Sequence, residues 1–220
     1  MQTKQSIAIL GATGNMGSAL TRSLAKGNYR LLLKSSNPRK LQALVKEIKS
    51  SHPGADLEVV GCSMEACWEA DIIIPAIPYE AQKEVAVKIK EFANQKIVVS
   101  IANPLNATYN GLVTDPDISA AEELQKLLPH SKVIKAFNTT FAADFAQPII
   151  DGKQADCFVA GNDSQALETV SELVRTAGFN PIVAGNLTTS RTLENMQLFL
   201  IQLALKYDYN RLAGWKILHN

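Results

Sequence analysis

The sequence has few cysteines and no long apolar run, and each scarcity excludes a class of protein. Three cysteines among 220 residues, Cys62, Cys67 and Cys157, are too few for a disulfide framework, and the first two are too far apart for a C-x-x-C redox pair. We therefore expect reduced thiols that pack as small apolar side chains. The start of the chain has no apolar stretch of signal-peptide length, and no later run is long enough to span a membrane. These features favour the cytoplasm.

The chain also lacks an excess of charge of either sign. Its 22 lysines and arginines nearly balance 21 aspartates and glutamates, for a formal net charge of +1. General attraction to nucleic acid or to an anionic membrane is therefore not expected, and any recognition of an anion must depend on a local cluster. A length of 220 residues is sufficient for one well-buried domain.

What the sequence does contain is a regular alternation of short apolar runs with amphipathic helical patterns. The predicted strands lie at residues 6–10, 29–33, 57–60, 71–75, 96–100, 132–137, 156–161 and 181–185. Helical periodicity is found between them, around residues 16–24, 41–48, 85–92 and 167–174. This alternation predicts an α/β fold with a doubly wound, mostly parallel sheet.

Three glycines follow the first predicted strand and open the first predicted helix. In the segment GATGNMG, Gly11 permits a tight turn, Gly14 lets the backbone approach a pyrophosphate, and Gly17 lets helix and strand pack closely. The start of the helix then offers free N–H groups to the phosphates. A P-loop is excluded because Ser18, rather than lysine, follows the third glycine. The alternative is a plain strand-to-helix turn without a ligand, but the context favours a dinucleotide-binding Rossmann sheet.

Two segments interrupt the alternation. Residues 103–116 form a loop too long for a simple connection, so we expect it to line a site. The last helix, at about residues 191–207, has one apolar stripe of Leu193, Met196, Leu200 and Leu203 and another of Leu198, Ile201 and Leu205. One stripe is enough to dock the helix, so the second predicts contact with a partner subunit in a homodimer. We expect an NAD(P)-binding domain at 1–190 and a helical segment at 191–220 that packs on it or on the partner.

The end of the second predicted strand bears on the choice of dinucleotide. An NAD-selective site places an acidic residue there for the ribose 2′-hydroxyl, whereas this chain reads LLLKSSNPRK and has no acid. Lys34, Ser35, Arg39 and Lys40 can instead donate hydrogen bonds to a 2′-phosphate, which favours NADP over NAD. The alternative is an ordinary solvated basic cluster, although positive charge at a helix N-terminus is locally unfavourable.

A catalytic acid is missing from the predicted site. His52 and His130 precede strands and so lie at the sheet edge opposite the one that binds ligands, and His219 is at the tail. Tyr79 and Lys83 have the Y-x-x-x-K spacing of short-chain dehydrogenases, but they follow only the fourth strand, too early for that fold. We interpret Tyr79 as an aromatic wall near the pyrophosphate or nicotinamide. No catalytic residue and no metal ligand is predicted.

The residues expected at the ligand-binding edge are neutral. They are Ala76, Ile77 and Pro78 after the fourth strand, Ser100, Asn103 and Pro104 after the fifth, and Asn138, Thr139 and Thr140 after the sixth. These groups can hold a nicotinamide ribose and carboxamide by hydrogen bonds, although Asn138 is equally suited to be a helix cap. A site without an acid suits hydride transfer directly between two redox cofactors, which the protein need only align.

Six segments taken in order, ILGATGNMG, KSSNPRK, AIP, KVIKAFNTTFA, FVAGND and AGNLTTSRTLE, resemble the deazaflavin-dependent NADP oxidoreductase family. They are also similar to the N-terminal reductase domain of the six-transmembrane prostate antigen ferric reductases. The resemblance spans residues 7–194. It implies a Rossmann domain that binds NADPH, hydride exchange with a deazaflavin or flavin as small-molecule acceptor, and a dimer formed through C-terminal helices.

The resemblance also implies roles for particular residues. Gly11, Thr13, Asn15 and Met16 would line the pyrophosphate; Ser35, Asn37, Arg39 and Lys40 would surround the 2′-phosphate; Ala76 and Pro78 would flank the nicotinamide ribose; and Asn138 would face the nicotinamide. The segment 187–191 would help to form the acceptor pocket. One departure is Ser36, where relatives commonly carry an arginine that stacks on the adenine.

Two other functions remain open at this point. The first is a dehydrogenase of a small hydroxyacid or imine, a class that usually adds a large helical domain with a catalytic lysine. The roughly thirty residues after Glu194 are too few for such a domain unless a partner subunit supplies it. The second is a dinucleotide-sensing module without turnover, because a Rossmann fold does not itself imply catalysis.

Overall fold

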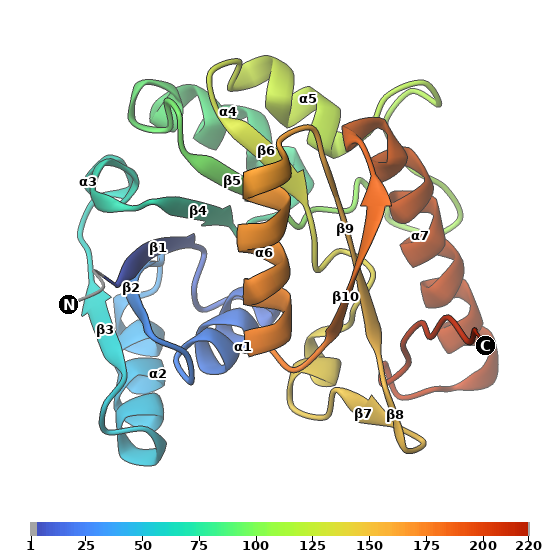
Figure 1. Ribbon diagram of the computed structural model, residues 1–220, viewed down its shortest axis with the longest axis horizontal. Helices are drawn as coiled ribbons and strands as arrows, with labels where there is room; N and C mark the ends of the chain where they lie inside the picture. Colours follow the sequence, from blue (N-terminus) through green and yellow to red (C-terminus); the bar gives the residue numbers. More distant parts are fainter. Residues whose placement is uncertain (1–3, 220) are drawn as a thin grey trace.

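The computed structural model describes residues 4–219, in which helices cover both faces of one central sheet (Figure 1). The strands are β1 (Gln5–Leu10), β2 (Tyr29–Lys34), β3 (Asp56–Val59), β4 (Ile72–Pro75), β5 (Ile97–Ser100), β6 (Lys132–Lys135), β7 (Ile149–Ile150), β8 (Lys153–Gln154), β9 (Asp156–Gly161) and β10 (Asn180–Gly185). The α-helices are α1 (Asn15–Leu24), α2 (Pro38–Ser51), α3 (Ser63–Glu69), α4 (Tyr79–Ile89), α5 (Ala120–Leu127), α6 (Ser164–Thr176) and α7 (Ser190–Tyr207). Short 3-10 turns are η1 (Lys90–Phe92), η2 (Ala142–Phe145) and η3 (Leu187–Thr189).

The central sheet has eight strands in the order β10-β9-β6-β5-β4-β1-β2-β3. All neighbours are parallel except β6 and β9, which run antiparallel. The chain builds the sheet outward from β1 through β2 to β3, then returns to place β4 on the other side of β1. This reversal opens a crevice at the carboxyl ends of β1 and β4, where doubly wound sheets bind their ligands.

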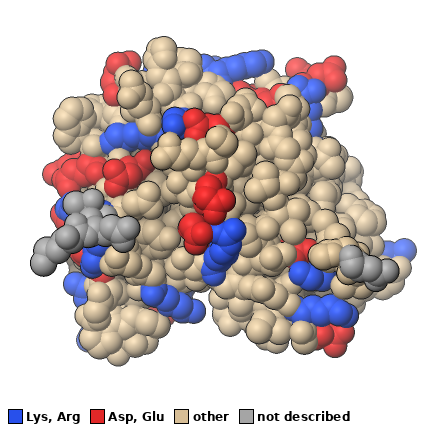
Figure 2. All heavy atoms as spheres, in the orientation of Figure 1, with Lys and Arg blue, Asp and Glu red and all other residues tan. Residues whose placement is uncertain are grey.

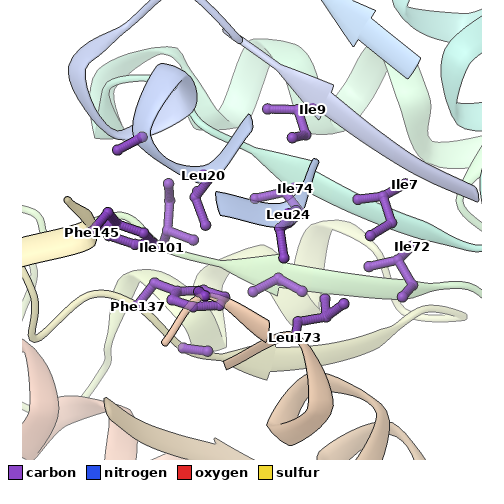
Figure 3. Packing of buried hydrophobic residues seen from close by; sticks show 14 of the residues in the cluster. Ile7, Ile9, Leu20, Leu24, Ile72, Ile74, Ile101, Phe137, Phe145 and Leu173 are labelled. Atoms are coloured by element: carbon purple, nitrogen blue, oxygen red, sulfur yellow. The ribbon is translucent and has the colours of Figure 1, made fainter. Parts of the chain in front are cut away.

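The alternating side chains of β1 explain why two helical layers are needed. Ile7 and Ile9 pack with Leu20, Leu24 and Leu173 in a cluster covered by α1, α2 and α6 (Figure 3). Ala8 and Leu10 point to the other face, into a cluster covered by α3, α4 and α5. Because both faces are buried, the strands are nearly continuous apolar runs rather than alternating ones.

The fold confirms the predicted α/β class and all eight predicted strands, with bounds within two residues. The apolar periodicity did not predict α3, α5 or the β7–β8 hairpin. Helix α3 has only seven residues, too few for a period to show. Helix α5 begins with a capping box in which the Ser119 hydroxyl accepts the Glu122 backbone N–H and the Glu122 carboxylate accepts the Ser119 N–H. That S-x-x-E pattern was the signal that could have predicted α5.

Surface charge is mixed, as the composition predicts. On the face seen in Figure 2, basic and acidic side chains are interspersed without a large area of one sign. Some form exposed ion pairs, such as Arg175 with Glu168 and Glu172 on α6. No helix in the described part of the chain combines the length and apolar character needed to cross a membrane.

Candidate functional site

The loop between β1 and α1 lies so close to neighbouring backbone atoms that two of the three glycines leave no room for a side chain. Gly11 has φ of +86°, and a Cβ there would lie 2.3 Å from the Ala76 carbonyl oxygen at the end of β4. A Cβ on Gly17 would lie 2.1 Å from the Gly11 carbonyl oxygen. Both obstructions are backbone atoms, which cannot move aside without moving a strand. The turn is fixed further by the Gly11 and Ala12 N–H groups, which both donate to the Lys34 carbonyl.

Gly14 is different, because the space beside it is open to a ligand. A Cβ there would meet the Gly11 oxygen only at 3.4 Å, an ordinary contact, and the residue is exposed. Gly14 is the N-cap of α1, has no side chain to satisfy the first N–H groups, and is followed by a first turn without acidic residues. A helix N-terminus of this kind suits a diphosphate, so the cradle fits the nicotinamide dinucleotide that the sequence predicts.

The basic cluster after β2 divides into groups that are engaged within the protein and groups that are free. Lys34 Nζ donates to the Gly61 carbonyl at 2.6 Å, and the buried Ser35 hydroxyl bonds to Thr13 Oγ1 at 2.5 Å and accepts the Asn37 N–H. The Asn37 side chain caps α2 by accepting the Lys40 N–H. Arg39 and Lys40 are exposed in the first turn of α2 and form no ion pair with a described carboxylate. They are the cations best placed for a 2′-phosphate.

Two asparagines predicted to contact the cofactor hold each other. Asn138 Nδ2 donates to Asn103 Oδ1 at 2.9 Å, and Asn103 Nδ2 donates to the Asn138 carbonyl at 2.9 Å. Asn138 is 1% exposed and also donates to the Leu193 carbonyl, so it lies behind Asn103 and is not a helix cap. Phe137, just before it, has φ of +60°, a conformation that an L-residue adopts only when its surroundings impose it.

A fully buried ion pair beside these asparagines was not predicted from the sequence. Lys135 of β6 and Glu194 of α7 are both 0% exposed and lie 2.6 Å apart. The lysine also donates to the Ala102 carbonyl, and the second carboxylate oxygen accepts the Ala120 N–H at the start of α5. Burial lowers the pKa of Lys135, which Glu194 opposes. The pair joins β6, the segment after β5, α5 and α7 at one point.

A cavity of about 780 Å³ lies next to the glycine loop. Its lining residues are Asn15 and Met16 from α1; Asn103, Leu105 and Tyr109 from the long loop; Thr140 to Ala143 after β6; Gln197, Ile201, Ala204 and Leu205 from α7; and Asp208, Asn210 and Arg211 beyond it. The walls are mainly apolar, so the cavity suits a flat aromatic ring. Of the loop 103–116, which the sequence predicts to line a site, Asn103, Leu105 and Tyr109 line this cavity.

The cavity changes the interpretation of α7. Residues 197, 201, 204, 205 and 208 share one helical face and line the cavity. Ile201 and Leu205, predicted to face a partner, line this wall, whereas Leu198 is 9% exposed. The segment 187–191 does not line the cavity. Leu187 is buried, and the Arg191 guanidinium pairs with Glu122. This ion pair lowers the pKa of the Glu122 carboxyl to about 2. Turns of α7 further along the chain line the cavity instead.

The other candidates lie away from this cavity. Tyr79 begins α4, and its hydroxyl donates to Glu123 of α5 at 2.7 Å. Burial, together with this hydrogen bond, raises the pKa of Tyr79. Tyr79 is interpreted from the sequence as an aromatic wall near the pyrophosphate or nicotinamide; in the structure its ring does not line this cavity. His52 caps the end of α2 and His130 precedes β6, both at the opposite edge of the sheet as predicted.

Asp144, beneath the cavity wall formed by η2, is a buried carboxyl with a strongly altered pKa. Its side chain is 0% exposed, Oδ2 accepts the Phe141 N–H at 2.7 Å, and Oδ1 has no partner. Burial raises its pKa from 3.8 to about 7, although the Phe141 backbone N–H opposes the change. The folded protein therefore holds a proton here that the unfolded chain releases near pH 4.

This carboxyl predicts a pH dependence of stability. Because the pKa of Asp144 is raised in the folded state, the stabilisation that its protonated form contributes is complete below about pH 4. This stabilisation is lost as the pH rises towards 7. The free energy of unfolding of the wild type minus that of Asp144→Asn should therefore fall between pH 4.5 and pH 8 in urea denaturation. A difference that is constant over this range would show that Asp144 titrates normally.

Comparison with known proteins places this geometry in context. The family model described as NADP oxidoreductase coenzyme F420-dependent matches residues 6–104, from β1 to just beyond β5. An F420-dependent NADP reductase of Methanocaldococcus jannaschii is 36% identical over 213 residues, covering 91% of this chain and 93% of that protein. Metalloreductase STEAP3 of Rattus norvegicus is 27% identical over 89% of this chain, which spans only 37% of that protein.

Solved structures agree with the fold. The crystal structure of a provisionally assigned F420-dependent NADP reductase from Arthrobacter sp. FB24 has a TM-score of 0.82 and 26% identity, covering 97% of this chain and 99% of the other. An imine reductase from Myxococcus stipitatus in complex with NAD+ has a TM-score of 0.69 but only 14% identity, and it is covered to 64% of its length. That second likeness bears on the fold alone.

Proposed function

Because the chain belongs to the family of coenzyme F420-dependent NADP oxidoreductases, we propose that it transfers hydride between NADP and a deazaflavin or flavin. The balanced reaction is NADPH plus oxidised acceptor plus a proton giving NADP+ and the two-electron-reduced acceptor, in either direction. The observation that carries this proposal is the mainly apolar cavity directly beside the glycine loop. It provides room for a second flat ring next to a dinucleotide held at the start of α1.

Each group of residues has a defined task in this proposal. Gly11, Gly14 and Gly17 shape the cradle for the pyrophosphate, with Thr13, Asn15 and Met16 around it. Arg39 and Lys40 neutralise the 2′-phosphate, and Lys34, Ser35 and Asn37 hold the loop that presents them. Ala76, Pro78 and Asn103 border the nicotinamide ribose, and Asn138 supports Asn103.

The bound cofactors supply the redox chemistry, and the protein supplies alignment and exclusion of water. The apolar residues of α7 exclude water from one side of the cavity, while the start of α1 faces them. No side chain is assigned the proton that accompanies the hydride, which solvent would supply. This accounts for a site built mainly from neutral groups.

NADPH oxidation followed by stopped flow, with a deazaflavin, FMN and FAD as separate acceptors, tests the function. We expect the fastest oxidation with the deazaflavin. Tight NADPH binding without oxidation by any of the three would contradict the proposal and support a dinucleotide sensor instead.

Preference for NADP over NAD is expected to depend on Arg39. Arg39→Ala removes one cation from the proposed 2′-phosphate site, and a charge-assisted hydrogen bond is worth about 1.5–3 kcal/mol. The dissociation constant of NADPH should therefore rise roughly 10- to 150-fold, while that of NADH changes little. Fluorescence titration of both dinucleotides measures this. Equal weakening of NADPH and NADH would show that the cluster does not contact the 2′-phosphate.

We further propose a homodimer, with residues 1–190 as the NAD(P)-binding domain and residues 191–220 packing on it or on the partner. Phe199 on α7 does not line the cavity and is 52% exposed, which supports an apolar contact there. Sedimentation of the full chain tests the mass of the proposed dimer.

The cytoplasm is the proposed compartment. It is supported by three free cysteines, two of which are buried. Burial raises the pKa of these two thiols to about 12.

A further inference from the structure

Gln197 is the polar residue of the cavity with the clearest unmet hydrogen-bonding requirement. It lies on the cavity-lining face of α7 and is 3% exposed. Its Oε1 is buried and has no hydrogen-bond partner in the described structure. A buried acceptor without a donor is unfavourable, and in native proteins such groups commonly await a ligand or water.

Two other polar residues of the cavity, Asn103 and Thr140, are already engaged. Asn103 exchanges hydrogen bonds with Asn138, and Thr140 Oγ1 donates to the Phe137 carbonyl at 2.8 Å. The next residues along the same face of α7, Ile201, Ala204 and Leu205, are apolar. Gln197 therefore presents a carboxamide at one end of an apolar wall.

The turn of α7 that precedes Gln197 is unusually well fixed. Glu194 is held by Lys135 and by the Ala120 N–H, and the Leu193 carbonyl accepts from Asn138. These contacts tie the helix to the ends of β5 and β6 one turn before Gln197. A side chain on such a support can recognise a ligand at a fixed position.

We propose that Gln197 recognises the pyrimidinedione edge of the acceptor ring. This edge, shared by flavins and deazaflavins, has an imide N–H next to a carbonyl oxygen. A primary carboxamide is its complement, because Oε1 accepts the imide N–H while Nε2 donates to the carbonyl. Gln197 then selects acceptors by this edge, while the apolar wall takes the remaining ring surface. The inference rests on the proposed function and names the group that determines its acceptor.

The test is a binding measurement with two probes that differ only at the imide nitrogen. 5-Deazariboflavin and its N3-methyl derivative are titrated against the full chain in the presence of NADP+, following ligand fluorescence. The wild type should bind the unmethylated ring roughly 10- to 100-fold more tightly, because a site built for an N–H discriminates against its loss. Gln197→Leu should abolish this discrimination and leave the dissociation constant of NADP+ unchanged.

Gln165→Leu on α6 is the matched control, since that glutamine is exposed and lies outside the cavity, and it should behave as the wild type. The substitution Gln197→Leu removes an unpaired buried oxygen, so we expect the variant to fold as the wild type does. An unchanged dissociation constant for NADP+ would show that it is folded. Unaltered discrimination in Gln197→Leu would overturn this inference alone. Failure of the wild type to bind either ring would overturn the proposed function together with it.

Discussion

Replacing Lys135 by Met is expected to lower the free energy of unfolding by about 3–5 kcal/mol. The substitution leaves the Glu194 carboxylate at 0% exposure without its cation. The Ala120 N–H would be its one remaining partner among the contacts described here, which is too little for a charge removed from water. Urea denaturation at neutral pH measures the change.

The double variant Lys135→Met, Glu194→Leu separates the two contributions. Because both charges are replaced by apolar side chains of similar volume, its stability should return to within about 1 kcal/mol of the wild type or exceed it. A loss below about 1 kcal/mol in the single variant would show that water reaches the carboxylate. An equal loss in both variants would show that packing, rather than charge, explains the effect.

Parts of the candidate site are predictable from the sequence because the residues that form them are neighbours along the chain. The glycines of the first loop, the strand before them and the helix after them lie within residues 5–24, so local spacing predicts both their geometry and their ligand. The absence of an acid after β2 is likewise a local feature. The sheet follows from apolar runs that are each contiguous in the sequence.

The remaining parts depend on contacts between residues far apart in the sequence. Lys135 and Glu194 are 59 positions apart, and each alone resembles an ordinary charged residue of an amphipathic segment. Gln197 gains significance only when α7 is placed opposite α1, which no local pattern specifies. The division of Asn103 and Asn138 into a cavity residue and its support also requires the fold. Sequence reasoning thus located the edge of the sheet but not the wall that faces it.

Substitutions at Gly14 and Gly17 are expected to have separate consequences. Alanine at Gly17 would place its Cβ 2.1 Å from the Gly11 oxygen and 2.9 Å from the Gly11 carbonyl carbon. Since these are backbone atoms at the end of β1, the helix must move away from the strand. We expect a loss of about 1–3 kcal/mol in unfolding free energy, which is typical of overpacking.

Gly14→Ala should instead leave the fold intact and impair the ligand. Gly14 has φ of −68° and ψ of 170°, which alanine adopts without strain, and its Cβ meets protein only at 3.4 Å. The methyl group would occupy space proposed for the pyrophosphate, and an overpacking term of about 1–3 kcal/mol corresponds to a rise of roughly 5- to 150-fold in the dissociation constants of both NADPH and NADH. Because both dinucleotides carry the same diphosphate, this common loss contrasts with the NADPH-specific effect expected for Arg39→Ala. Thermal unfolding of Gly14→Ala without ligand should match the wild type. Undiminished affinity for both dinucleotides in this variant would place the diphosphate elsewhere and remove the basis for assigning the cavity beside it to the acceptor.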